Sequence, residues 1–276
     1  MKIVLAGSPT IALAAFEKII NNFEVLAIIT QPDKPQGRGL KVKPTPVGEL
    51  GQKYGLKVLK TSDIKTIFDD LKALEFDLLL TFAFGQFISQ EILDLGSYKP
   101  LNIHGSILPK YRGAAPIQYA ILNGDQEIGI SLIEMTNKMD AGNIYFMAKK
   151  SIDETTTSEE GFNIISNLAA DNIVNWLKKV KINQVKPWVQ GDNFSLSPKI
   201  TKVMAKLTNE LTVNQALRKI RAFNPVPGAF AFLQNKRLKI FNGSKQFVKN
   251  AIVINFSDGN LWATDYQWEG KKRFKL

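Results

Sequence analysis

The sequence of 276 residues contains no cysteine and a single histidine, His104. The absence of cysteine excludes disulfide bonds and thiolate chemistry. One histidine without cysteine also argues against a zinc site, which normally takes several such ligands. No apolar run approaches the roughly 20 residues of a membrane-spanning helix, and the apolar start before Gly7 is too short for a signal peptide. We therefore expect a cytoplasmic protein with no metal and no membrane partner.

The positive charge is concentrated in the last third of the chain. Residues 1–187 hold 21 Lys and Arg against 20 Asp and Glu, whereas residues 188–276 hold 15 against 5. The net charge of +11 therefore lies almost entirely in the carboxyl-terminal part. This asymmetry favours a polyanionic partner, and nucleic acid is the preferred interpretation. A generally basic surface without such a partner is the alternative.

The first two thirds alternate short apolar runs with amphipathic segments. This alternation predicts the α/β class, with a doubly wound and mostly parallel sheet. We expect strands at 2–7, 25–30, 56–59, 77–82 and 100–103. Helices are expected at 11–20, 46–54, 63–74 and 86–95. Two antiparallel strands at 129–135 and 143–152 and a long helix at 158–180 complete this part.

The remaining chain predicts a second, smaller domain. We expect a first domain over 1–185, a polar linker over 186–207 and a basic domain over 208–276. A helix is predicted at 212–223. Short apolar strands separated by turns follow it, at 229–233, 238–241, 248–256 and 261–263. This pattern is typical of a small β-barrel of the oligonucleotide-binding kind, and whether the barrel is complete stays open.

Three residues suggest a chemical site. Asn102 and His104 are two residues apart in a predicted strand, so their side chains point to the same face. A carboxamide donor beside an imidazole can stabilise an oxyanion, and an imidazole exchanges protons near neutral pH. Asp140 lies in a turn-like segment, where it can orient the imidazole or accept its proton. On spacing alone, a lone histidine at the end of a strand is the commoner interpretation.

The sequence from Asn102 to Gln118, NIHGSILPKYRGAAPIQ, changes that balance. It resembles the signature of the folate-dependent formyltransferases, most closely those that formylate methionyl-tRNA. Such proteins carry an Asp-x-Gly segment, which Asp140–Gly142 matches. The resemblance implies that Asn102, His104 and Asp140 are catalytic. It also implies that the folate is held by Ser106, Ile107, Leu108 and Pro109. The main chain of Phe84 and Gly85, at the carboxyl end of a predicted strand, is expected to bind the pterin ring.

Residues 31–44 form a long segment rich in Pro, Gly and positive charge, QPDKPQGRGLKVKP. Loops of this length are usually functional or disordered, and glycines let the backbone approach phosphates closely. The segment resembles an insertion that enters the acceptor stem of tRNA in the proteins that formylate methionyl-tRNA. We therefore expect tRNA contacts from Lys34, Arg38, Lys41 and Lys43, with Arg38 foremost. A solvated surface loop is the alternative.

The resemblance implies a definite reaction. A formyl group would move from 10-formyltetrahydrofolate, a co-substrate, to the α-amino group of methionine on initiator tRNA. The product, formyl-methionyl-tRNA, serves translation initiation, and we expect the protein to be a monomer. Alternatives are another folate-dependent formyltransferase, a formyltetrahydrofolate hydrolase with the same core, or a non-catalytic RNA-binding relative. The basic last third argues against the first two, and the intact triplet of Asn102, His104 and Asp140 argues against the third.

Replacement of Asn102 or His104 by alanine should leave the fold intact and lower the rate of formyl transfer by about 10²–10³-fold. Losing one oxyanion donor typically costs about 2.7–4 kcal/mol of transition-state stabilisation. Turnover is the measurement, and circular dichroism with thermal unfolding is the control for folding. Turnover near that of the wild type in either variant would overturn the assignment.

Overall fold

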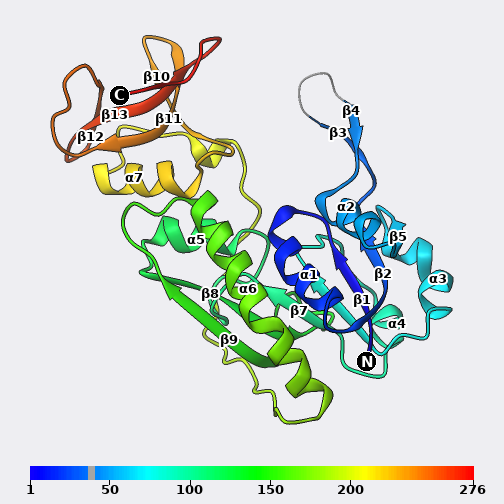
Figure 1. Cartoon of the computed structure of the whole chain (residues 1–276). Coiled ribbons are helices and arrows are strands. Elements are labelled where there is room, and N and C mark those ends of the chain that lie inside the picture. The colour runs from blue at the N-terminus through cyan, green and yellow to red at the C-terminus, as the bar shows by residue number, and fades with distance from the viewer. Residues whose placement is uncertain (37–40) are drawn as a thin grey trace. The chain divides into compact units, whose positions relative to one another are not determined.

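The computed structural model describes residues 1–36 and 41–276 (Figure 1). The chain folds into two compact units, and each unit is built from three segments that alternate along the sequence. The first unit comprises Met1–Ala114, Gly129–Lys150 and Asn163–Leu196. The second comprises Ala115–Ile128, Ser151–Phe162 and Ser197–Leu276. The linear division into 1–185, 186–207 and 208–276 stays a prediction.

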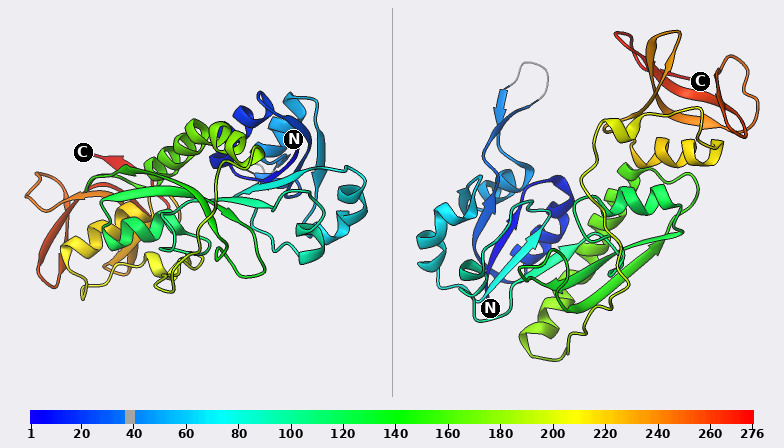
Figure 2. Two further views of the ribbon diagram at one scale, coloured as in Figure 1. Left: turned by 90° about the horizontal axis from the view of Figure 1, so that it is seen from below. Right: turned by 180° about the vertical axis from the view of Figure 1, so that it is seen from behind.

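The first unit is built on a seven-stranded sheet, seen from two further directions in Figure 2. Its order is β5 (Lys57–Lys60), β2 (Glu24–Thr30), β1 (Lys2–Gly7), β6 (Leu78–Phe82), β7 (Leu101–His104), β8 (Glu127–Glu134) and β9 (Ile144–Ser151). The pairings from β5 to β7 are parallel, whereas β8 runs antiparallel to β7. The predicted α/β fold with a mostly parallel sheet is therefore confirmed. Because β2 and β6 lie on opposite sides of β1, the strand order reverses at β1. Open α/β sheets bind ligands at such a switch point, outside the carboxyl ends of the strands.

The central strands are apolar along their whole length because they are buried in the core. Ile3, Leu5, Leu78 and Leu80 are fully buried, as expected for parallel strands covered on both faces. The helices of this unit are α1 (Leu13–Ile20), α2 (Pro46–Lys53), α3 (Phe68–Lys72) and α4 (Gln90–Leu93), together with α6 (Ser158–Lys181) from Asn163 onward. Short 3-10 turns, η1 (Thr10–Ala12) and η2 (Ile64–Ile67), precede α1 and α3.

The helix predicted over 86–95 is wrong at its amino end, because the helix starts only at Gln90. The Gln86 amide donates to the carbonyl of Thr61 at 2.7 Å and accepts from the N–H of Ile64 at 2.8 Å. These two bonds hold residue 86 against a neighbouring turn, where it cannot join the helix.

The predicted loop over 31–44 contains a short hairpin of β3 (Lys34–Gln36) and β4 (Lys41–Lys43). Lys34 lies opposite Lys43, and Gln36 lies opposite Lys41. In Figure 1 the hairpin projects away from the sheet of its unit. Arg38 lies outside the described residues.

The second unit contains α5 (Pro116–Asn123), η3 (Val203–Ala205) and α7 (Val213–Ala222) with an antiparallel sheet. The sheet order is β10 (Ala229–Leu233), β11 (Lys236–Ser244), β13 (Gly259–Trp268) and β12 (Ile252–Phe256), and β14 (Phe274–Lys275) also pairs with β13. Helix α7 buries Val213, Ala216 and Ile220 against the sheet. Among the described strands β10 and β12 do not pair, so the predicted barrel is a half-barrel. Across the described residues, no helix combines the length and apolarity needed to span a bilayer.

Candidate active site

The predicted triplet comes together on one face of the sheet of the first unit. Asn102 and His104 extend from β7, and Asp140 comes from the loop between β8 and β9. Asn102 Nδ2 lies 3.5 Å from Asp140 Oδ1, and His104 Nδ1 lies 3.5 Å from Asp140 Oδ2. The side chain of His104 is 6% exposed and that of Asp140 is 14% exposed. Two potential donors thus surround one largely buried carboxylate, although the catalytic role of the triplet stays a prediction.

The hydrogen bond of His104 to the main chain defines which ring nitrogen is available for chemistry. His104 Nε2 lies 2.9 Å from the carbonyl oxygen of Tyr111. Because a carbonyl oxygen only accepts, Nε2 carries a hydrogen. The other ring nitrogen, Nδ1, faces Asp140.

The carboxamide of Asn102 is oriented by a residue that the sequence did not identify. Thr81, on the adjacent strand β6, donates from Oγ1 to Asn102 Oδ1 at 2.8 Å. This bond directs Asn102 Nδ2 toward Asp140. Thr81 is 3% exposed and is the one polar residue in the apolar strand Leu78–Phe82. A buried polar residue in such a strand was the available signal, because burial demands a hydrogen-bond partner.

The loop that carries Asp140 adopts a demanding conformation. Asp140 has a φ of 49°, in the left-handed region that residues other than glycine rarely occupy. Gly142 packs so closely against Glu134 that an added Cβ would overlap the Glu134 carbonyl. The main-chain N–H of Gly113 donates to Asp140 Oδ2 at 2.8 Å. Ala83 and Tyr111, beside the predicted folate residues, also have positive φ, and strained positions of this kind gather at functional sites.

The predicted folate loop is held in place by buried hydrogen bonds. Ser106 Oγ donates to the Lys110 carbonyl at 2.6 Å, and Ser131 Oγ donates to the Ser106 carbonyl at 2.8 Å. The N–H of Leu108 donates to Ser131 Oγ at 3.2 Å. Ser106 and Leu108 are buried, whereas Ile107 and Pro109 are partly exposed. The first pair therefore shapes the loop, and the second pair is available to a ligand.

Phe84 and Gly85 follow β6 at its carboxyl end. The Phe84 side chain is 5% exposed and belongs to the core, whereas Gly85 is exposed with a φ of 75°. Only main-chain atoms are thus open to a ligand here, as the predicted pterin contact requires. That contact stays a prediction.

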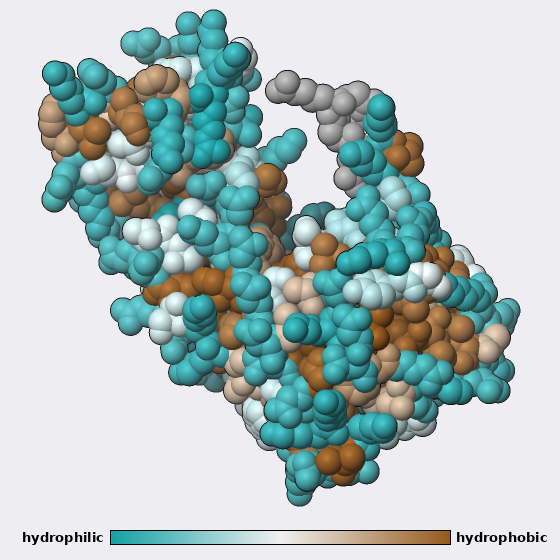
Figure 3. All heavy atoms as spheres, in the orientation of Figure 1, coloured by the Kyte–Doolittle hydropathy of each residue, from teal (hydrophilic) through white to brown (hydrophobic). Residues whose placement is uncertain are grey.

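The lysines predicted to contact tRNA lie on the hairpin of β3 and β4. Lys34, Lys41 and Lys43 are all exposed. Because successive residues of a strand alternate between faces and Lys34 lies opposite Lys43, all three lysines share one face. The described surface of the hairpin is predominantly hydrophilic in Figure 3. Arg38 lies outside the described part of the chain, so its position is not assigned.

Part of the predicted linker belongs to the first unit. Trp188 exchanges two main-chain hydrogen bonds with Ile144, at 2.9 and 3.0 Å. Further along, the Arg112 N–H donates to the Ser195 carbonyl at 2.9 Å. Gln190 lies between these points and bonds to the Asp140 loop. The composition of the predicted linker, rich in Pro, Gly and polar residues, gave no indication of this packing.

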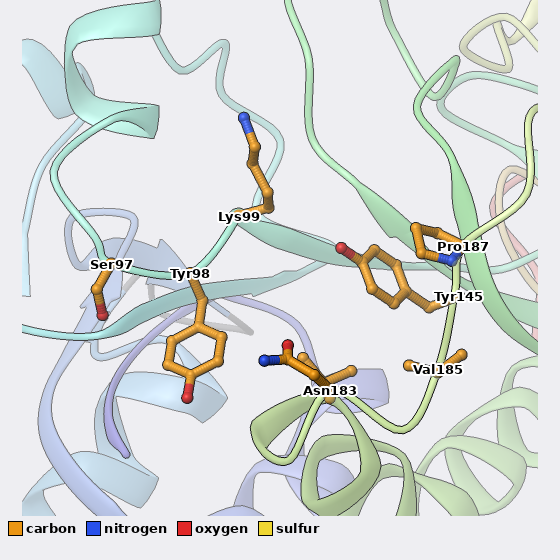
Figure 4. Close-up of a pocket in the computed structure, with 8 residues that line it drawn as sticks. Ser97, Tyr98, Lys99, Tyr145, Asn183, Val185 and Pro187 are labelled. Atoms are coloured by element: carbon orange, nitrogen blue, oxygen red, sulfur yellow. The ribbon is translucent and has the colours of Figure 1, made fainter.

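A separate depression of about 560 Å³ lies in the first unit. In Figure 4 the rings of Tyr98 and Tyr145 stand on opposite sides of the Asn183 side chain. Burial raises the pKa of Tyr145, and the carboxylate of Glu134 raises it further. None of the predicted site residues is among the residues that line it, which are Ser97, Tyr98, Lys99, Tyr145, Val180, Asn183, Val185 and Pro187. Within the described ranges, no cluster of His, Asp or Glu is suited to hold a metal ion.

Replacement of Thr81 by valine should lower the rate of formyl transfer up to about tenfold without unfolding the protein. Valine matches threonine in shape but cannot donate to Asn102 Oδ1, a bond worth about 0.5–1.5 kcal/mol. The Asn102 amide then loses its fixed orientation. Turnover should be compared with that of Thr66→Val, which changes an exposed threonine elsewhere in the unit. Equal activity of Thr81→Val and the wild type would show that Thr81 does not orient the amide.

Comparison with known proteins identifies relatives along the whole chain. Methionyl-tRNA formyltransferase of Mycoplasmopsis pulmonis is 48% identical, covering 100% of this chain and 96% of the relative. The enzyme of the same name from Mesoplasma florum is 36% identical over 95% of this chain and 86% of its own.

Solved structures share the fold at lower identity. WlaRD, a sugar 3N-formyltransferase, superimposes with a TM-score of 0.71 at 20% identity and covers 99% of both chains. HypX from Aquifex aeolicus, solved with tetrahydrofolic acid, has a TM-score of 0.66 at 18% identity, covering 100% of this chain and 45% of its own. Residues 1–176 match the formyl transferase family, and residues 199–276 match the formyl transferase C-terminal domain. The chain therefore belongs to the formyl transferase family.

Proposed function

We propose that the protein transfers a formyl group from 10-formyltetrahydrofolate to the α-amino group of methionine on initiator tRNA. The observation that carries the proposal is the convergence of Asn102 Nδ2 and His104 Nδ1 on the carboxylate of Asp140. Relatives that match the whole chain and carry the name methionyl-tRNA formyltransferase support it.

The triplet supplies the groups that acyl transfer to an amine requires. As the amine nitrogen bonds to the formyl carbon, Asn102 Nδ2 and protonated His104 Nδ1 donate hydrogen bonds to the oxyanion. Asp140 stabilises the imidazolium and accepts the proton that the attacking amine loses. Cleavage of the bond between the formyl carbon and N10 of the folate then releases tetrahydrofolate, and Asp140 passes the proton that it took from the amine to N10. Atoms and charges balance without a covalent intermediate on the protein.

The folate donor is proposed to lie along the Ser106–Pro109 loop. Ile107 and Pro109 offer partly exposed apolar surface, and the main chain of Phe84 and Gly85 offers hydrogen bonds to a pterin edge. This location follows the carboxyl ends of β6 and β7, where open α/β sheets bind their ligands.

The hairpin of β3 and β4 is proposed to contact the tRNA backbone. Lys34 and Lys43 lie directly opposite each other, and Lys41 extends the same face. Like charges directly opposite each other destabilise a hairpin. A phosphate backbone removes this repulsion and gains electrostatic binding. We propose that Arg38 and the basic residues 208–276 contact the same tRNA, with 186–207 as the connection to that part.

We also propose that the protein acts as a monomer in the cytoplasm, away from membranes. Charged initiator tRNA and the folate donor are both solutes of that compartment. The described chain contains one copy of each group that the reaction requires, so no second copy has to complete the site.

The direct test is formyl transfer by the purified protein. We expect formyl-methionine on initiator tRNA when 10-formyltetrahydrofolate and Met-charged tRNA are supplied together. Elongator methionyl-tRNA, an amino sugar nucleotide and a reaction without acceptor serve as comparisons. Formylation of the amino sugar alone would identify a different formyltransferase. Formate release without acceptor, with no formylated tRNA, would indicate a hydrolase.

Removal of the three hairpin lysines should weaken tRNA use without impairing the chemistry. A variant with Lys34, Lys41 and Lys43 changed to Gln should show a higher KM for methionyl-tRNA. Its plot of log kcat/KM against log salt should be flatter by roughly two to three units, since each of the three phosphate contacts contributes a little under one unit. The KM for the folate donor should not change.

The matched control loses the same charge from the same unit at other exposed positions, Lys18, Lys65 and Lys72. If that control flattens the salt dependence as strongly as the hairpin variant, net charge rather than the hairpin contacts the tRNA.

A further inference from the structure

Gln190 is a buried residue in an otherwise exposed stretch of chain. It is 8% exposed, whereas Trp188 is 43% and Val189 is 79% exposed. A glutamine side chain loses water and rotational freedom when it is buried, so its partners must compensate. Those partners indicate what the residue does.

The Gln190 amide uses all of its hydrogen-bonding capacity. Nε2 donates to the carbonyl oxygens of Asp140 and Gly142, at 2.8 and 2.7 Å. Oε1 accepts from Arg112 Nε and Nη2, at 3.0 and 2.8 Å. Rotating the amide by 180° would place oxygen against carbonyls and NH₂ against a guanidinium. The environment therefore permits a single orientation.

Gln190 joins the two segments that position His104 and Asp140. One segment is the Asp140 loop, whose left-handed backbone at residue 140 needs support from outside. The other is Tyr111–Gly113, which contacts His104 Nε2 through the Tyr111 carbonyl and Asp140 Oδ2 through the Gly113 N–H. Gln190 bonds to the first segment directly and to the second through Arg112.

The Arg112 side chain is itself held in place. Its guanidinium carbon lies 4.4 Å from the centre of the Phe194 ring, and its main-chain N–H bonds to Ser195. Phe194 and Ser195 belong to the same stretch as Gln190. This stretch, 188–196, thus braces both segments from outside, and Gln190 is its point of contact with Asp140.

We propose that Gln190 is a positioning residue, which holds Asp140 at the distance and angle at which its carboxylate stabilises protonated His104 and accepts the proton of the attacking amine. The inference rests on the proposed formyl transfer. Gln190 touches no reacting atom and acts only through the Asp140 main chain. A displacement of about 1 Å in a catalytic group lowers rates by about 10²-fold, so such support has a large kinetic effect.

The decisive variant is Gln190→Glu, which keeps length and volume and still accepts from Arg112. Its second carboxylate oxygen faces the two carbonyls in place of the NH₂ donor, so the Asp140 loop moves away. We expect kcat to fall by about 10- to 100-fold, with the KM values for folate donor and methionyl-tRNA within about threefold of the wild type. The control is Gln184→Glu, the same charge change at an exposed position in the same unit.

A second readout does not depend on activity. Because His104 is the only histidine, its Cε1 proton gives a single imidazole signal in an NMR spectrum. Gln190→Glu and Asp140→Asn should shift this signal in the same direction at fixed pH, and Gln184→Glu should leave it unmoved. Gln190→Met, which removes every hydrogen bond of the amide without adding charge, repeats the test if Gln190→Glu does not fold.

A double-variant cycle separates positioning from general stability. In an Asp140→Asn background, Gln190→Glu should lower kcat by less than threefold, because residues that act as one unit are not additive. An undiminished further loss, or an unshifted His104 signal, would overturn the proposal. Wild-type protein that formylates no acceptor would reject the proposed function alone, since the NMR comparison still decides whether Gln190 positions Asp140.

Discussion

The site depends on one largely buried carboxylate. Asp140 accepts a hydrogen bond from the Gly113 N–H and lies within 3.5 Å of the side-chain nitrogens of Asn102 and His104. A buried carboxylate without hydrogen-bond partners is costly. With total stabilities of about 5–15 kcal/mol, the fold has to supply these partners from separate segments at fixed positions. Sheet register provides two of them, and loop packing provides the rest.

The contributions of strands and loops explain which parts of the site were predictable. The two-residue spacing of Asn102 and His104 places them on one face of any strand, so their proximity follows from periodicity alone. Thr81 was missed because its pairing with Asn102, 21 residues further along the chain, depends on the register of two strands, which no local pattern encodes. Asp140 was placed by resemblance, since the turn that brings it to β7 folds through the contact of Gly142 with Glu134.

For the fold, too, local sequence patterns predict an element only where contacts with distant residues do not override them. Strands with long apolar runs, such as Leu78–Phe82, were predicted within a residue, because burial on both faces determines their composition. The helix expected at 86–95 was shortened by side-chain bonds of Gln86 to residues 61 and 64, which outweigh local helix propensity. Gln190 was assigned to a linker for the same reason. Its role comes from partners about 50 and 78 residues away.

Two kinds of interaction with substrate are separated in this chain. In the proposed function, the hairpin lysines meet charges that the tRNA carries in every state, so they are expected to increase binding without favouring the transition state. In the proposed reaction, Asn102, His104 and Asp140 meet charge that develops only as the amine attacks, so they are expected to act on the rate. The first kind tolerates an exposed hairpin, because long-range charge attraction depends weakly on geometry. The second kind depends on fixed distances, and the residues proposed to hold them, Thr81, Gly113 and Gln190, are hydrogen-bonded and not exposed, whereas the lysines are exposed.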